Sequence, residues 1–158
     1  MGVKLLESRL CLLLLLGFVI MVASFQIPPG LTPSQWFEIQ HVNNRTNLRC
    51  NPAMRIVNGY TRRCKNINTF LNTSFPAVAR VCGRPNTNCT RSPGTNCHNS
   101  SAQVSLTYCN LTNPGSHYTQ CQYQMTPARK FYRVACNNRT PQDNGSYAVV
   151  PVHLDDIY

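Results

Sequence analysis

The chain has 158 residues, with 15 Lys and Arg against five Asp and Glu, which gives a formal net charge of +10. This length fits one domain rather than several, and so large an excess of cations exceeds what solubility alone requires. The charge favours a polyanionic partner, such as a nucleic acid, a glycosaminoglycan or an anionic lipid surface.

The N-terminal segment has the pattern of a secretory signal peptide. Lys4 and Arg9 precede an apolar run from Cys11 to Ala23, which is short for a membrane span and is followed by no stop-transfer charges. We expect cleavage between residues 24 and 27, so that residues 1–27 are the leader and residues 28–158 form the secreted domain. A membrane anchor is the alternative, which the length and flanks of the run disfavour.

The cysteines agree with a secreted domain, because eight of the nine lie after the leader. An even number in such a chain predicts four disulfides, although spacing alone leaves their pairing open. Cys89 and Cys97 are close together in a loop-rich segment and look like a local bridge. No close C-x-x-C pair is present, and an oxidising route disfavours free thiolates, so we expect no metal site.

Seven N-x-S/T sequons suit the exposed loops of a secreted glycoprotein. They begin at Asn44, Asn72, Asn88, Asn99, Asn110, Asn138 and Asn144.

The first helix is expected to begin at Pro33, after Thr32 as its cap, and to run through Val42. Phe37 and His41 are four residues apart and share a face, so Phe37 should enter the core and carry His41 to its edge. On its own, a histidine in this position is more often structural than catalytic.

Two more helices and several strands are expected. A second helix should cover residues 51–57, with Asn51 as its cap and Gly59 at its end, and a third should follow Ser74 and end at Gly83. No strand–helix–strand rhythm follows, so the order predicts an α+β fold with antiparallel strands. Alternation and strand propensity place the strands at residues 68–70, 103–108, 118–125, 130–135 and 147–154.

Four histidines supply the imidazoles of the chain. His98 and His117 lie in polar loops, where we expect them to be solvated. His41 and His153 lie instead on a predicted helix and a predicted strand. Asp155 follows His153 by two residues, which places both side chains on one face of a regular strand. A carboxylate there can hold one ring nitrogen and fix the tautomer of the imidazole.

Two imidazoles together with Lys65 suit the cleavage of RNA, whose 2′-hydroxyl lies beside its phosphodiester. A neutral histidine can take the hydroxyl proton, and a protonated histidine can give one to the leaving 5′-oxygen. Lys65 can stabilise the charge of the crowded phosphorus centre in the transition state. This chemistry needs no metal and no cofactor, and DNA, which lacks the nucleophile, should be inert.

The stretch from Cys64 to Phe70 resembles the signature segment of the pancreatic-type ribonuclease family. Gln40-His41 and the segment from Pro151 to Asp155 match its other two catalytic segments, and the cysteine spacing matches along the whole mature chain. The features most similar to the eosinophil branch of this family are Trp36, the segment from Tyr60 to Cys64, and Phe131-Tyr132.

The resemblance implies a role for each matched residue. His41 would be the base and His153 the acid of transphosphorylation, and they would exchange roles when the 2′,3′-cyclic phosphate is hydrolysed. Lys65 would stabilise the transition state. The matched residues that would bind or position the substrate are Gln40, Asn68, Thr69, Phe70, Asn96 and Asp155.

Within that set the expected contacts differ. Gln40 would contact the phosphate, and Thr69 would read the pyrimidine 5′ of the cut, with Phe70 packed behind it. Asn96 would read the base on the 3′ side, and Asp155 would orient the acid. Asn137 stands where relatives place an acid, which puts a purine preference on the 3′ side in doubt.

The resemblance also implies a fold and partners. We expect three short helices, a bent, kidney-shaped antiparallel sheet and the disulfides Cys50–Cys109, Cys64–Cys121, Cys82–Cys136 and Cys89–Cys97. The expected partner is single-stranded RNA, with the cytosolic ribonuclease inhibitor as a second partner. A monomer, secreted and stored in granules or lysosome-like vesicles, is expected.

A second hypothesis is a cationic host-defence protein that binds anionic membranes or glycosaminoglycans without needing RNA cleavage. Its basis is the concentration of arginines in the first half of the expected secreted domain. These are Arg45, Arg49, Arg55, Arg62, Arg63, Arg80, Arg84 and Arg91.

Overall fold

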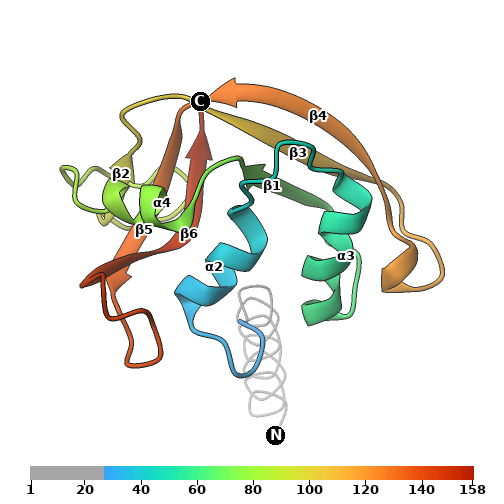
Figure 1. Ribbon diagram of the computed structural model, residues 1–158, viewed down its shortest axis with the longest axis horizontal. Coiled ribbons are helices and arrows are strands. Elements are labelled where there is room, and N and C mark those ends of the chain that lie inside the picture. The colour runs from blue at the N-terminus through green and yellow to red at the C-terminus, as the bar shows by residue number, and fades with distance from the viewer. Residues whose placement is uncertain (1–26) are drawn as a thin grey trace, which may run out of the picture.

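The computed structural model describes residues 27–158 (Figure 1). The predicted leader and its cleavage point lie outside the described residues. Among these residues, no helix is long and apolar enough to cross a membrane. The elements in chain order are α2 (Pro33–His41), α3 (Cys50–Thr61), β1 (Ile67–Leu71), α4 (Phe75–Val81), β2 (Cys97–Asn99), β3 (Val104–Asn113), the short 3₁₀ helix η1 (Tyr118–Gln120), β4 (Gln122–Lys130), β5 (Tyr132–Asn138) and β6 (Val149–Ile157).

The predicted α+β class with antiparallel strands is confirmed. The strands form two three-stranded sheets, with the orders β1-β3-β4 and β2-β5-β6. In Figure 1, β3 and β4 arch over the top of the molecule, β5 and β6 lie at the left, and α2 lies between them. Because α2 packs against both β1 and β6, its C-terminal end lies where the two sheets approach each other.

The first helix forms as its sequence predicts. The Thr32 hydroxyl accepts a hydrogen bond from the Gln35 backbone N–H at 3.0 Å, and Gln35 Oε1 accepts the Thr32 backbone N–H at 2.9 Å. This reciprocal capping box and Pro33 in the first turn fix the start of α2. Phe37 is buried in the core, as predicted, and α2 ends at His41.

The second helix differs from the prediction at both ends. Asn51 does not cap α3, because its side-chain amide bonds to β4: it donates to Gln122 Oε1 at 2.7 Å and accepts the Tyr123 N–H at 2.9 Å. Gly59 does not end it either. The helix continues to Thr61, and Arg62 closes it in the left-handed region with a φ of 59°.

Two further local predictions fail for tertiary reasons. His98, expected in solvent, lies on β2 with 5% exposure, and its Nδ1 lies 2.6 Å from the Arg84 carbonyl oxygen. The strand expected from Tyr118 begins only at Gln122, because residues 118–120 form a 3₁₀ turn. The third helix agrees with its prediction, since the Ser74 hydroxyl caps it by accepting the Ala77 N–H at 3.3 Å.

Strand β1 separates two apolar cores. Phe70 packs with Met54 and Val57 beneath α3, whereas the adjacent Leu71 packs with Phe37 and the strands of the second sheet. The predicted role of Phe70 as a core anchor is therefore confirmed by its 3% exposure. The two apolar cores cover opposite faces of β1, and this packing fixes the position of the strand and of the residues just before it.

All four disulfides implied by the family resemblance are present. They are Cys50–Cys109, Cys64–Cys121, Cys82–Cys136 and Cys89–Cys97.

Removing Cys50–Cys109 should destabilise the fold more than removing Cys89–Cys97, because the pairs are separated by 59 and 8 residues. Loop-closure entropy gives losses of about 4 and about 2.5 kcal/mol respectively. Urea unfolding of the two double-alanine variants measures both free energies. Equal losses would contradict the ordering.

Candidate active site

The three residues predicted to be catalytic come from three different segments. His41 ends α2, Lys65 immediately precedes β1, and His153 lies in β6. They are electrostatic neighbours, because the positive charges of Lys65 and His153 both lower the pKa of His41, and Lys65 also lowers that of His153. The structure therefore brings together the residues that the sequence places 24 and 88 positions apart.

The tautomer of His41 is fixed by the strand beside it. Nδ1 lies 2.8 Å from the Thr69 carbonyl oxygen, which can only accept, so Nδ1 carries the hydrogen. The neutral ring then has a free lone pair on Nε2, the atom a general base needs. Burial, followed by the charge of Lys65, lowers the pKa of His41 well below its ordinary value and keeps the ring neutral at neutral pH.

Lys65 is held by amides rather than carboxylates. Its ammonium Nζ donates to Gln40 Oε1 at 2.7 Å and to Asn68 Oδ1 at 2.8 Å. Burial lowers its pKa to about 8. The lysine is thus a largely protonated cation at neutral pH, and these neutral partners leave its charge available to an anionic ligand.

Asn68 connects this lysine to α2. Its side chain is 2% exposed, accepts from Lys65 and donates through Nδ2 to the Gln40 carbonyl oxygen at 2.8 Å. These bonds give Asn68 a positioning role toward Lys65. Gln40 accepts through Oε1, so its Nε2 remains as the donor that could face a phosphate.

A second set of buried polar groups, missed in the sequence, fixes the backbone of Lys65. Asn58 Oδ1 accepts the Lys65 N–H at 3.0 Å, and the Tyr123 hydroxyl donates to the Lys65 carbonyl at 2.6 Å. Asn58 Nδ2 closes the ring by donating to the Tyr123 hydroxyl at 2.9 Å. The available signal was the position of Asn58 four residues after the core residue Met54, on the buried face of α3.

Lys65 and Thr69 are not brought to the site by regular alternation along one strand. β1 begins only at Ile67, which is 62% exposed, whereas Thr69 is 9% exposed. Lys65 lies before the strand and is drawn to the site by its bonds to Asn68 and Gln40. Thr69 is tied to the site by its carbonyl bond to His41.

His153 and Asp155 do not share the environment that a regular strand would give them. Register shifts in the β5–β6 pair leave Asp155 as an extra residue beside the opposed pair Arg133 and Asp156. His153 is exposed, while Asp155 is completely buried. The bulge breaks the two-residue alternation on which the prediction depended.

The hydrogen bonds of Asp155 in the structure go to a loop rather than to His153. Its Oδ2 accepts the Thr90 N–H at 2.7 Å, and its Oδ1 accepts the Arg91 N–H at 2.9 Å. Its effect on His153 is electrostatic. Although the residue as a whole is exposed, partial desolvation of the imidazole lowers the pKa of His153; the Asp155 charge opposes this shift and Lys65 reinforces it, so the pKa stays below its ordinary value.

Asn96 lies beside Asn137, the position at which the family resemblance implies an acid. Its Nδ2 donates to the Cys136 carbonyl at 3.0 Å and to Asn137 Oδ1 at 2.9 Å. The two amides form a neutral pair. Its role toward the base on the 3′ side stays a prediction.

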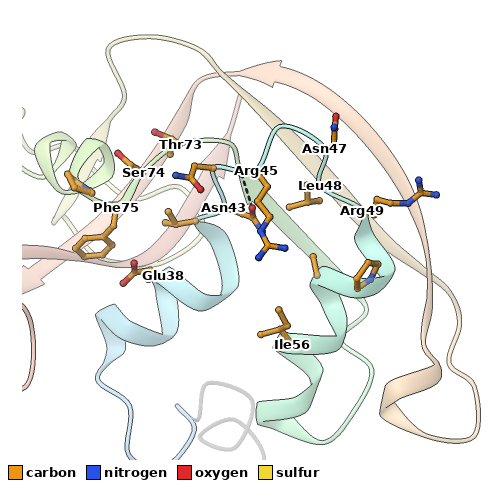
Figure 2. Close-up of a pocket in the computed structure, with 15 residues that line it drawn as sticks. Glu38, Asn43, Arg45, Asn47, Leu48, Arg49, Ile56, Thr73, Ser74 and Phe75 are labelled. Carbon is orange, nitrogen blue, oxygen red and sulfur yellow. Dashed lines mark hydrogen bonds between the residues drawn. The ribbon is translucent and has the colours of Figure 1, made fainter.

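Two other features lie outside this constellation. A groove of about 570 Å³ runs between α2 and α3, with Glu38, Arg45, Ile56 and Phe75 among its lining residues (Figure 2). No predicted site residue lines it. In the described part of the chain, the one cluster with metal-ligand spacing consists of Cys89, Cys97 and Asp155, and its two sulfurs are joined in a disulfide.

An α+β fold with four disulfides, in which two histidines and a lysine converge, defines the ribonuclease class that the sequence motifs suggest. A family model of pancreatic ribonuclease matches residues 32–155. The chain therefore belongs to the pancreatic ribonuclease family, and the predicted resemblance is confirmed. By this membership it is an RNA-cleaving enzyme.

Similar proteins come from rodents and match from end to end. The eosinophil cationic protein of Rattus norvegicus is 61% identical over 158 residues, which is 100% of both chains. The non-secretory ribonuclease of Mus musculus is 58% identical over 158 residues, and the eosinophil cationic protein 2 of the same species is 55% identical over 159, again with 100% of each chain covered. The predicted likeness to the eosinophil branch is thus confirmed.

Asn58→Ala should lower the free energy of unfolding by about 1–3 kcal/mol, because the Lys65 N–H and the Tyr123 hydroxyl lose a buried partner. Asn66→Ala is the matched control. Asn66 is an exposed amide next to Lys65 in the chain, and its replacement should change the free energy of unfolding by no more than about 0.5 kcal/mol. Urea unfolding measures both variants. Equal stability of the two would exclude the proposed support of Lys65.

Proposed function

We propose that the chain is an endoribonuclease that cleaves single-stranded RNA 3′ of pyrimidines through a 2′,3′-cyclic phosphate, without a metal or cofactor. The observation that carries the proposal is the pairing of a base in a fixed tautomer with a cation held by neutral groups. The His41–Thr69 bond supplies the first, and the bonds of Lys65 to two amides supply the second.

In the first step, Nε2 of His41 takes the proton of the 2′-hydroxyl, and the resulting oxygen attacks the neighbouring phosphorus. The additional negative charge on the phosphoryl oxygens is stabilised by the ammonium of Lys65 and the free amide N–H of Gln40. Protonated His153 gives its proton to the departing 5′-oxygen. Hydrolysis of the cyclic product then reverses the two roles, with water in place of the leaving alcohol.

The preference for a pyrimidine rests on Thr69. Its carbonyl bond to His41 sets the distance between the residue that would read the base and the residue that would take the proton. Phe70, buried behind it, keeps this segment of β1 in place. When the Thr69 hydroxyl recognises a nucleobase, the ribose of the same nucleotide therefore presents its 2′-hydroxyl to His41.

Secretion, granule storage and a host-defence role belong to the same proposal. The predicted leader and four disulfides support an oxidising route. The eight arginines named from the first half of the expected secreted domain are all exposed, which specifically favours the second candidate function, binding to anionic membranes or glycosaminoglycans. A His41→Ala protein that still permeabilises anionic vesicles would assign that activity to the charged surface; loss of both activities would argue against it.

His41→Ala and His153→Ala should each lower kcat/KM for a uridine-containing dinucleotide by about 10²–10⁴, the usual contribution of a general acid or base. Lys65→Ala should lower it by about 10²–10³, as for the loss of a group that stabilises an oxyanion. His117→Ala, at an exposed histidine, is the control and should keep full activity. An inactive wild type, or an active His153→Ala, would refute the mechanism.

Activity should follow a bell-shaped pH profile, because His41 must be neutral while His153 is protonated. The acid limb should lie below that of an ordinary histidine, since burial and Lys65 lower the pKa of His41. Activity should fall as the pH rises through the lowered pKa of His153, and loss of the Lys65 proton near pH 8 should add to the fall. Rates of dinucleotide cleavage at constant ionic strength measure both limbs, and a flat profile would contradict them.

A further inference from the structure

Asp155 is a buried charged residue, which by itself is unfavourable. The carboxylate has 0% exposure. Asp155 is the extra residue of a β-bulge in β6 and has no partner on β5. A buried charge is tolerated only when hydrogen bonds and an opposite charge compensate for its lost hydration. The backbone N–H groups of Thr90 and Arg91 supply two hydrogen bonds, one to each oxygen.

The opposite charge comes from Arg133 on β5, which the sequence did not single out. Its Nη1 lies 3.9 Å from Asp155 Oδ2 and also donates to the Thr90 hydroxyl. Its Nε donates to Asn99 Oδ1 at 2.7 Å. The guanidinium carbon lies 5.4 Å from the ring centroid of Tyr158, and the Arg133 side chain is only 18% exposed.

The contacts of Arg133 converge on the two groups that surround Asp155. One nitrogen reaches both the carboxylate and Thr90, the loop residue that donates to the same carboxylate. The aromatic ring and Asn99 then hold the guanidinium from two other directions. This clamp, defined as Arg133 with Tyr158 and Asn99, restrains the carboxylate and the loop together.

We propose that Arg133 is a positioning residue for the acid His153: it holds Asp155 at its bulge, so that the carboxylate stays at a fixed distance from the imidazole. The assignment of His153 as an acid rests on the proposed function. The clamp itself rests on contacts that do not depend on catalysis.

The charges around His153 determine in which direction its pKa should move when the clamp is lost. The positive group near it is Lys65, His41 beside it is neutral at neutral pH, and Asp155 is the anion that raises its pKa. The neighbouring elements supply no substitute: β5 presents Ala135 opposite His153, Arg80 on α4 is exposed, and Glu38 on α2 is exposed in the α2–α3 groove.

Loss of the clamp should therefore lower the pKa of His153. If Arg133 only neutralised Asp155 without positioning it, removing the cation would leave this pKa unchanged or raise it. The direction of the shift separates the two roles.

The test is an NMR titration of the His153 ring in Arg133→Met and the wild type, with Arg129→Met as the control. Arg129 is an exposed arginine on β4, so this control loses the same charge away from the site. We expect the pKa of His153 to fall by about 0.5 in Arg133→Met, which lowers the protonated fraction about threefold above the pKa. The control should not move it.

A double-mutant cycle tests the route through Asp155. Asp155→Asn should lower the His153 pKa by itself, and adding Arg133→Met should lower it no further. An unchanged or raised pKa in Arg133→Met, or an additive double variant, would overturn the proposal. Urea unfolding, run in parallel, records the loss of stability that a purely structural arginine would also give.

A second pair of variants serves if Arg133→Met does not fold. Tyr158→Ala removes the ring beside the guanidinium and should lower the His153 pKa in the same direction, whereas Tyr158→Phe keeps the ring and should leave it unchanged. No shift in Tyr158→Ala would then count against the clamp.

The titration needs no substrate, which separates this inference from the proposed function. If the wild-type protein leaves the dinucleotide intact but the pKa shift occurs, the clamp stands and the catalytic assignment fails. If cleavage occurs without any shift, the clamp alone is wrong. With both present, kcat/KM of Arg133→Met should fall on the basic limb and keep the acid limb of the wild type.

Discussion

The site depends on one amide. Asn68 donates to the last-turn carbonyl of Gln40 and accepts from the ammonium of Lys65, so a single buried side chain joins α2 to the segment before β1. The carbonyl of the next residue, Thr69, binds the ring of His41. Two adjacent residues of one strand therefore set the positions of both Lys65 and the ring of His41.

Within the segment that the structure describes, the positive charge of the site is not neutralised by carboxylates that contact it. The charge of Lys65 lowers the pKa of His41, burial lowers that of Lys65 itself, and the partners that hold Lys65 are amides. Asp155, the one buried carboxylate among residues 27–158, has both oxygens occupied by loop N–H groups. Such an arrangement favours a phosphodiester, because its negative charge can pair with Lys65, which no carboxylate of the described residues neutralises.

The sequence predicts those parts of the fold that depend on local chemistry or on family motifs. Thr32 and Pro33 predict the start of α2 because capping acts within one turn. The disulfide pairs and the set of site residues follow from resemblance. By contrast, Asn51 and His98 were misassigned, because each takes a hydrogen-bond partner from a segment distant in the chain. The relation of His153 to Asp155 was missed for a similar reason, since a bulge depends on two strands and leaves no mark in one of them.

Strand β1 has a consequence for how such a site can change over evolutionary time. Phe70 and Leu71 face different cores, and Asn68 and Thr69 are buried against α2 and the ring of His41. Most substitutions in this strand would therefore disturb packing and chemistry at once. Ile67 is its one exposed position. Within β1, Ile67 is therefore the one position where a new side chain can alter the surface without disturbing either core or the ring of His41.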